Sequence, residues 1–471
     1  MALDSQLNDG GPGNQFTDRL LVVGAASGAT TIHVSSVGRS QPALTGVTPT
    51  SGISIVQVGG EASPQNFTLS GGYVAAGPYQ MRLVHFAPAQ AAPGELDPAL
   101  AAHGVTQFND FRLQTEQVLQ PGTPPDGNLP GQPVGIGPEG ELPGQELVVP
   151  QVPAYLALPT GALHYASVLL DDLHKRVGDL TPPPLDTLNA LDAANGFPYA
   201  PNAFVRVKGW TGTVTGSLQP DFHQRIWMLQ AGGGVTWPGV FAEGDRVDGN
   251  IVMSQGGSRS TVAVNHSVSR FDATGFGLTA TYRSAGGAYA DLVAQGLFFT
   301  NVGFSTDERG SVGSTSGSGF VTSLEAGLPF VLGRWATIEP RAALAYQTDH
   351  FRPFTDVDGV QTDLGNASSL AARIGTRLSH AFAFQSSRGA GEISPFVTVD
   401  YVRSLVGHNH ETVGGVVFYD DTGGNALKYG CGISVRLQQR MSGYVSFEHV
   451  SGRGAPSATG NEILGTFRYV F

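Results

Sequence analysis

Three side chains that could bind a metal ion stand close together in the last quarter of the chain. His408, His410 and Glu411 lie within the stretch VGHNHETVGG. Imidazole nitrogens and carboxylate oxygens are common zinc ligands. However, adjacent positions on a Gly-rich turn favour a solvated loop over a metal site about nine to one. We therefore expect no metal centre.

Motifs for nucleophilic catalysis and for phosphate binding are missing from the sequence. No GxSxG elbow is present, and GSVGSTSGSG at 310–319 lacks the strand and helix that frame a phosphate loop, so we interpret it as a flexible loop. Cys431 is the single cysteine, which excludes an intramolecular disulfide and a Cys-based zinc site. We expect no enzyme activity and no cofactor.

The most regular arrangement of charged groups lies between residues 204 and 471. There, charged side chains occupy alternate positions and apolar side chains occupy the positions between them. Successive side chains of a strand point to opposite faces, so the charges should line one polar surface. The set comprises Arg206, Arg283, Glu325, Glu339, Arg341, Arg373, Arg377, Asp400, Arg436 and Arg468. Such an interior holds water and offers ion-pair partners to a guest segment.

Long amphipathic strands must position these charges. Their alternation extends over about ten residues, whereas strands of soluble sheets usually have five or six. Strands of about 9–11 residues match a tilted crossing of a bilayer, and lipid permits only closed barrels among β-structures. At roughly 22 residues per strand and turn, the region supplies about twelve strands around a narrow polar lumen. Aromatic residues near strand ends suggest interfacial girdles: Trp210, Tyr282, Tyr346, Tyr401, Tyr429 and Tyr469.

Composition limits the classes of partner and the location. The chain has 471 residues, enough for two or three domains, and 26 Lys and Arg against 38 Asp and Glu, a net charge of −12. This balance argues against a nucleic-acid partner. No run of 18 uncharged apolar residues predicts a membrane helix. The start, MALDSQLNDGG, lacks the features of a signal peptide, so an exported protein would begin upstream of it.

The N-terminal half divides into three segments ahead of the strand-rich region at 204–471. Residues 1–86 contain short β-rich runs separated by Gly and Ser turns, and 87–153 is a Pro- and Gly-rich stretch that we interpret as an exposed linker. Within 154–203, apolar residues recur at spacings of three and four and predict a helix over 162–180 with Thr160 as its N-cap. A docking helix on a soluble core is the alternative interpretation.

Several stretches resemble the translocator barrel of classical autotransporters, the type V secretion family. They are FVRVKGW, IWMLQAGGGV, SGFVTSLEAGLPFVLGRWATIEPRAALAYQ, the DVDG loop, LAARIGTRL and the closing FRYVF. Upstream, FTDRLLVVGAASGATTIHVSSVG and the run from GISIVQVGG to FTLSGGYVAAGPYQMRL resemble the last rungs of the family's β-helical passenger and its autochaperone region. The resemblance implies a mainly β fold: a twelve-stranded antiparallel transmembrane barrel with a pore-threading α-helix, preceded by a short parallel β-helix.

The resemblance also implies a role, a location and partners. The chain would export or anchor its own N-terminal passenger at the surface of a Gram-negative bacterium, with the barrel in outer-membrane lipid. The barrel assembly machinery and periplasmic chaperones would be its partners. The alternating C-terminal residues Ile463, Phe467, Tyr469 and Phe471 resemble the family's assembly signal. The pore helix would contain Leu163, Leu169, Leu170, Asp171, Asp172, Leu173, Lys175, Arg176 and Gly178.

One departure from the family and two other functions have to be considered. Asp171 and Asp172 stand where some members carry an asparagine pair for self-cleavage, so that reaction is not expected. We expect these residues and Asp179 to pair with lumen arginines, unless the arginines simply line a hydrated pore. The other functions are an outer-membrane barrel without an export role and a secreted soluble β-rich adhesin or enzyme.

Overall fold

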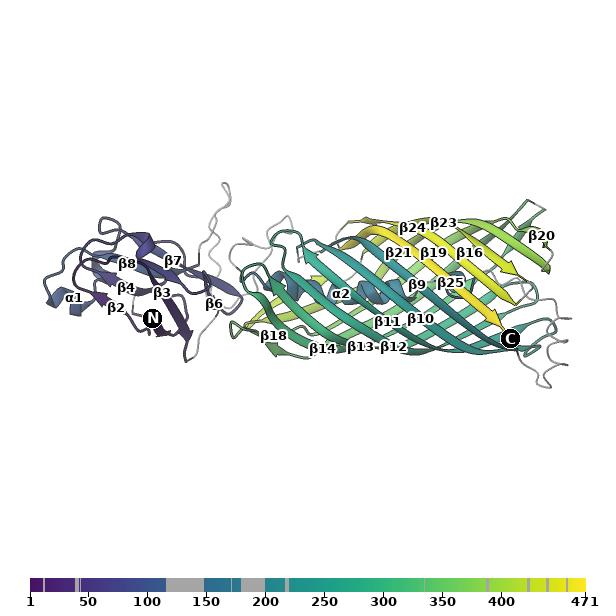
Figure 1. The fold of residues 1–471 in the computed structure, drawn as a ribbon, viewed down its shortest axis with the longest axis horizontal. Coiled ribbons are helices and arrows are strands. Elements are labelled where there is room, and N and C mark those ends of the chain that lie inside the picture. Colours follow the sequence, from purple (N-terminus) through teal and green to yellow (C-terminus); the bar gives the residue numbers. More distant parts are fainter. Residues whose placement is uncertain are drawn as a thin grey trace.

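A small β-rich N-terminal domain and a long barrel make up the fold in a computed structural model of the chain. Figure 1 shows the domain at one end of the barrel, the C-terminus at the other end, and a helix inside. We call the two ends of the barrel the domain-side rim and the C-terminal rim. The structure describes residues 1–11, 13–38, 42, 44–115, 148–170, 172–178, 200–216, 220–333, 335–386, 389–421, 424–437, 440–454 and 456–471.

Twelve long antiparallel strands close the barrel, as predicted. The first, β9 (Ala200–Thr215), pairs with the last, β25 (Ser457–Val470). Between them follow β10 (Phe222–Pro238), β11 (Arg246–Val262), β12 (Val268–Arg283), β13 (Tyr289–Thr306), β14 (Gly310–Gly327), β16 (Ala336–Phe351), β19 (Asn366–Ser379), β21 (Gly389–Val413), β23 (Asn425–Leu437) and β24 (Met441–Arg453). Short strands extend the hairpins: β15 (Phe330–Leu332), β17 (Phe354–Thr355), β18 (Gln361–Asp363), β20 (Phe382–Ser386) and β22 (Val416–Asp421).

The barrel strands are longer than the predicted 9–11 residues, because pairing continues beyond the hydrocarbon thickness toward both rims. The shortest, β23 and β24, have 13 residues each, and the longest, β21, has 25. Two segments predicted as loops are therefore strand: 310–319 belongs to β14, and most of VGHNHETVGG belongs to β21. Small and polar residues are accommodated there because neighbouring strands supply the backbone partners.

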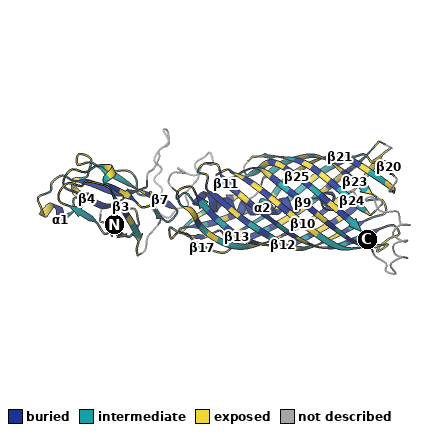
Figure 2. Cartoon of the chain, viewed as in Figure 1, coloured by how far each residue is buried: buried dark blue, intermediate teal, exposed yellow. Residues whose placement is uncertain are grey.

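Buried and exposed positions alternate along the barrel strands (Figure 2). The exposed positions are largely apolar, whereas the buried ones include both the charged residues of the lumen and an apolar cluster that packs against α2. In β25, the exposed fraction is 65 % for Ile463 and 2 % for Glu462. Trp210 contradicts the predicted girdle: it is 2 % exposed and its ring lies edge-on to His164, with centroids 4.3 Å apart. Its position has the same parity as Arg206, so its side chain must point inward.

Leu344 tests the assignment of the outer face. It lies near the middle of β16 and is half exposed on the outside of the barrel. A Leu344→Arg substitution should cost about 2–4 kcal/mol of folding free energy, because it places a charge at the bilayer midplane. Unfolding of the purified barrel in lipid measures the cost. Ala343→Arg, on the inner face of the same strand, is the control, and an equal loss in both variants would contradict the assignment.

The interior helix begins ten residues earlier than predicted. Helix α2 spans Val152–Leu170 and a short helix, α3, spans Leu173–Val177. Thr160 is not an N-cap but an internal residue of α2 that donates its hydroxyl hydrogen to Asp420 at 3.0 Å. Pro153 lies in the first turn, where no N–H partner is needed. Among the described residues, no helix is long and apolar enough to span a membrane.

Helix α2 is buried over most of its surface, and the exceptions are His164, half-buried, and Ser167, exposed, which line a cavity of the lumen. An amphipathic pattern therefore located it poorly, and the barrel wall around it allows Pro159 and Gly161 inside the helix despite their low propensity. The free energy gained by burying α2 outweighs the tendency of Pro159 and Gly161 to interrupt a helix.

The N-terminal domain combines parallel and antiparallel sheets. A parallel sheet contains β1 (Ala2–Ser5), β3 (Thr30–Ser36) and β5 (Phe67–Leu69). A mixed sheet contains β2 (Leu20–Val22) parallel to β4 (Ile53–Val58), followed by the antiparallel β8 (Asn109–Gln114), β7 (Tyr79–Phe86) and β6 (Val74–Ala76). Short helices are η1 (Pro64–Asn66), η2 (Pro93–Glu95) and α1 (Pro98–Ala102). A shared apolar core, including Ile32, Ile55 and Leu113, joins the sheets.

Two predicted boundaries are wrong. Residues 87–115 are not linker, because β8 places Phe111 and Leu113 in the domain core between β4 and β7. The barrel begins at Ala200 instead of residue 204. The remainder of the predicted linker, 116–147, lies outside the described residues.

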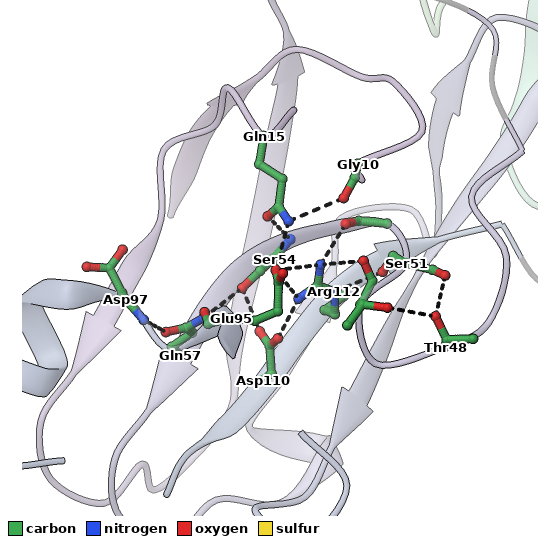
Figure 3. Close-up of polar contacts among 12 residues, drawn as sticks. Gly10, Gln15, Thr48, Ser51, Ser54, Gln57, Glu95, Asp97, Asp110 and Arg112 are labelled. Atoms are coloured by element: carbon green, nitrogen blue, oxygen red, sulfur yellow. Dashed lines mark hydrogen bonds and ion pairs between the residues drawn. The ribbon is translucent and has the colours of Figure 1, made fainter. Parts of the chain in front are cut away.

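Arg112 ties the last strand of the N-terminal domain to two loops (Figure 3). Its guanidinium donates to the backbone oxygens of Ser51 and Gly52 at 2.8 and 2.9 Å. It also forms ion pairs with Asp110 at 2.8 Å and Glu95 at 3.2 Å. Burial raises the pKa of Asp110, although Arg112 opposes that shift. The fully buried arginine is therefore a central polar contact of the domain.

Candidate functional site: the helix-filled barrel interior

The C-terminal end of α2 is neutralised by two cations from the first barrel strand. Arg206 donates to the carbonyl oxygen of Leu169 at 2.6 Å, and Lys208 donates to that of Val168 at 2.6 Å. The last carbonyls of a helix have no partner within the helix and carry the negative end of its dipole. Strand β9 thus supplies positive charge where the buried helix needs it.

An arginine holds the chain where α2 ends and α3 begins. Asp172 is the N-cap of α3 and accepts a hydrogen bond from the backbone N–H of Lys175 at 2.9 Å. Its other oxygen accepts from Arg341 Nη1 at 2.8 Å. Arg341 also binds Asp400 through Nε at 3.0 Å and Nη2 at 2.6 Å. Arg341 therefore connects the inner helix to β16 and β21.

Lys175 connects α3 to the strands that close the barrel. Its Nζ lies 3.0 Å from Glu448 and 2.8 Å from Glu462. Glu462 also pairs with Lys208 of β9 at 3.1 Å. The hydroxyl of Thr466 donates to the backbone oxygen of Lys175 at 2.7 Å. The seam between the first and last strands is thus linked to the helix by charge.

A second polar group lies on the opposite wall. His174 Nε2 is 2.7 Å from Glu339, and the Tyr289 hydroxyl donates to Glu325 at 2.8 Å and lies 3.1 Å from Glu339. Arg373 completes this group through an ion pair with Glu325. The neighbouring Arg176 of α3 pairs with Asp291 at 2.5 Å. Side chains of α3 therefore contact several sides of the wall at once.

The remaining predicted lumen residues lie toward the C-terminal rim. Arg468 pairs with Asp248 at 3.3 Å, and Arg436 pairs with Glu392 at 2.9 Å. The Arg377 guanidinium lies over the ring of Phe396, 4.4 Å from its centroid. Arg283, at the end of β12, is also buried. All ten predicted residues thus face the interior, and each ion pair named above joins one strand to another or to the segment of α3 with its N-cap.

Cavities remain in the lumen beside the helices. One, of about 150 Å³, lies beside α2 and is lined in part by His164 and Ser167. Another, of about 260 Å³, lies toward the C-terminal rim and is lined in part by His174, Arg283 and Glu392. The enclosed helix therefore blocks the lumen to an extended polypeptide.

The other predicted site residues fall in two places. Leu163, Leu169, Leu170 and Leu173 are buried with the helices, and Gly178 ends α3 with a φ of 74°. Asp171 and Asp179 lie outside the described residues. At the C-terminus, Ile463, Phe467 and Phe471 are exposed on the outer face, and the Tyr469 ring lies 4.9 Å from that of Phe471.

Several interior residues of this network were missed by the sequence reasoning, among them Asp248, Glu392, Glu462, Tyr289 and Asp291. Glu462 shares the parity of Thr466 and Arg468, so extending that alternation would have identified it. Tyr289 and Asp291 stand at the start of β13, a strand to which the sequence analysis assigned no alternation. At 408–411, Glu411 is a buried strand residue that accepts a hydrogen bond from Asn409 at 2.6 Å, so the predicted solvated loop is wrong.

Residues 203–448, more than half of the chain, match the family described as the autotransporter β-domain. The chain belongs to the autotransporter β-domain family. The barrel is accordingly an outer-membrane translocator barrel of a Gram-negative bacterium. An outer-membrane position explains why its exterior is apolar and its interior charged.

Similar curated proteins are also autotransporters. The chain is 25% identical over 452 residues to the probable autotransporter YfaL of Escherichia coli, covering 94% of this chain and 32% of that protein. It is 24% identical over 220 residues to the autotransporter adhesin/invasin TibA of Escherichia coli, covering 45% and 22%. The chain therefore spans a third or less of the length of these relatives.

Solved autotransporter domains are among the similar structures. The β domain of Bordetella BrkA is 18% identical, with a TM-score of 0.48, and the match covers 58% of this chain and all of that domain. The transport unit of AIDA-I from Escherichia coli is 13% identical, with a TM-score of 0.49, over 68% and 99%.

Proposed function

We propose that this autotransporter chain carries its own N-terminal segment across the outer membrane and then anchors it at the cell surface. The observation that carries the proposal is topological. The N-terminal domain and the C-terminus lie at opposite ends of a closed barrel, and α2 connects them through the lumen (Figure 1). A closed barrel has no lateral opening, and passage of the chain along the lumen would produce this arrangement.

The structure corresponds to the state after export under this proposal. The helix fills the lumen, and buried ion pairs from Asp172, Lys175 and Arg176 hold α3 in place. Retaining these contacts blocks the pore and keeps the exported segment attached. Asp172 at the position of the family's asparagine pair favours anchoring without self-cleavage. The role is one of transport and attachment, without catalysis by the barrel.

The N-terminal domain, residues 1–115, is proposed as the last part of the passenger. Parallel pairing of β1 with β3, β3 with β5, and β2 with β4 supports a β-helical end that closes with antiparallel strands. Such a unit can serve as an autochaperone, since solenoid folding propagates from a formed rung to the next. Folding of this domain outside the membrane would bias movement of the chain outward.

Assembly of the barrel is proposed to depend on the closing strand. Ile463, Phe467, Tyr469 and Phe471 form the outward apolar pattern at the C-terminus. Before β25 pairs with β9, its free edge can be bound by strand addition. The barrel assembly machinery and periplasmic chaperones are the proposed partners in that step.

Protease treatment of intact cells tests the proposed export. We expect added protease to remove an epitope placed before residue 1 while leaving the barrel intact, because the N-terminal domain is outside the cell. Heat-modifiable migration on gels verifies that the barrel has folded in the same sample.

Permeabilised cells provide the control for protease access. An epitope that is digested only after permeabilisation would place the domain in the periplasm and favour an outer-membrane barrel without an export role. A chain that remains soluble without detergent would instead favour the secreted β-protein.

A further inference from the structure

Tyr73 is the central contact between the N-terminal domain and the domain-side rim. It follows β5 and is only 1 % exposed, although it lies at the edge of its own domain. Its hydroxyl is 2.8 Å from Asp358 and 3.1 Å from Gln151. Arg309, in the turn between β13 and β14, lies over the Tyr73 ring at 4.4 Å and pairs with Asp358 at 3.2 Å.

The same rim loop holds the start of the pore helix. Gln151 donates to Asp356 at 3.0 Å and to Asp358 at 2.9 Å, and Tyr155 donates its hydroxyl hydrogen to Asp356 at 2.8 Å. One loop between β17 and β18 thus contacts both the N-terminal domain and α2. A movement of the domain away from the rim would break contacts of the segment that enters the pore.

Backbone contacts add to this junction. Val149 N–H donates to the carbonyl oxygen of Pro78 at 2.8 Å. Gly77 and Gly414 have positive φ values of 64° and 57°, and a methyl group on Gly414 would lie 2.5 Å from the backbone of Gly77. Only glycine permits such an approach in this conformation.

Apolar packing is continuous across the junction. Tyr73 and Tyr79 of the domain belong to the same buried cluster as Val149 and Tyr155, and this cluster continues into the barrel interior. Ala75 packs against it and is half-buried. The two bodies therefore share a core in addition to polar contacts.

We propose that the domain-side rim is a docking surface for the chain's own N-terminal domain, in which Tyr73 of the domain binds Arg309 and Asp358 of the rim. The domain stays seated over the pore after export, as a cap that holds the outer end of α2. This location outside the cell rests on the proposed function, whereas the docking itself concerns the folded chain. A linker alone would have let the domain move independently of the barrel.

Two physical features stabilise the contact of Tyr73 with Arg309 and Asp358 in water. A cation over an aromatic face and a charge-assisted hydrogen bond both strengthen when they are shielded from solvent. Burial raises the pKa of Tyr73, and the neighbouring Asp358 raises it further, so the phenol remains a hydrogen-bond donor.

Thiol labelling of the purified full chain in micelles tests the docking. Cys431, which is exposed on the barrel, is first replaced by serine, and Ala75→Cys is introduced as the reporter. A bulky maleimide should react slowly with this docked chain. Adding Arg309→Ala and Asp358→Asn together should increase the labelling rate about tenfold, as expected for the loss of about one decade in the docking equilibrium.

Matched variants separate undocking from loss of structure. Arg19→Ala breaks the ion pair of Arg19 with Asp97 inside the N-terminal domain, where Arg19 is about as exposed as Arg309, and should leave the rate unchanged. Tyr73→Phe removes only the hydroxyl and should raise the rate a few-fold, which keeps the test valid if the double variant misfolds.

The docking is contradicted if neither the Arg309→Ala/Asp358→Asn double variant nor Tyr73→Phe increases the labelling rate. It is also contradicted if Arg19→Ala increases the rate as much as they do. Because the measurement uses purified protein, it is independent of export. The two proposals can therefore fail separately. If the double variant and Tyr73→Phe are labelled faster but the domain is protected from protease on intact cells, the docking is supported and the proposed export is rejected.

Discussion

Arg341→Met is expected to lower the free energy of unfolding of the barrel by about 3–5 kcal/mol, because it leaves buried carboxylates without their cation. Arg341 pairs with Asp172 at 2.8 Å and with Asp400 at 2.6 Å, and the three side chains are each 1 % exposed. Methionine preserves most of the side-chain length, so the loss reports charge more than volume. Denaturant unfolding in micelles, followed by tryptophan fluorescence, measures it.

Arg436→Met is the control for this prediction. Arg436 and Glu392 form a pair 2.9 Å apart in the same barrel, but both are about one-fifth exposed. A solvated pair of this kind is worth less than about 1 kcal/mol. Equal losses in the two variants would contradict the special role of Arg341.

The link to the helix can be isolated by a double-mutant cycle. If Arg341 acts through the seated helix, Arg341→Met combined with Asp172→Asn should cost less than the sum of the two single variants. Additive losses would show that Arg341 serves the wall through Asp400 alone.

Arg112→Met is expected to destabilise the N-terminal domain by about 3–5 kcal/mol while leaving the barrel folded. The substitution leaves Asp110 and Glu95 without their shared cation and removes donors from the carbonyls of Ser51 and Gly52. Hydrogen exchange of the full chain measures the two bodies separately, since protection of each reports its own opening free energy.

Arg82→Met provides the comparison for Arg112. Arg82 lies on the neighbouring strand β7, is exposed, and donates to Gln80 at 3.2 Å. A surface change of this kind should alter stability by no more than about 0.5 kcal/mol. A similar loss of protection in both variants would contradict the role of Arg112.

Strand parity was the most reliable information in the sequence. The alternation of Ile463, Phe467 and Phe471 with Thr466 and Arg468 is local, and it already separated the outer from the inner face of the closing strand. The twelve-stranded barrel followed from repeating that pattern over a known length. Trp210 was assigned to the outer girdle without applying this pattern, and that prediction was wrong. Its parity, the same as that of Arg206, already indicated an inward side chain.

Some features of the fold depend on tertiary packing, and local sequence patterns did not predict them. Helix α2 contains Pro159 and Gly161 and is buried over most of its surface, so neither amphipathic spacing nor capping signals marked its start. Likewise, no sequence pattern indicated that β8 joins the N-terminal sheet through Phe111 and Leu113.

The sequence by itself determined which side chains are charged, which face of each strand they occupy and how many strands can form. The tertiary structure alone decided the partners: Arg341 with Asp172, Lys175 with Glu462, and Tyr73 with Asp358. Side-chain direction repeats every two residues and is a local property of a strand. Pairing depends on strand register and on the depth of the helix in the lumen, which only the closed barrel establishes.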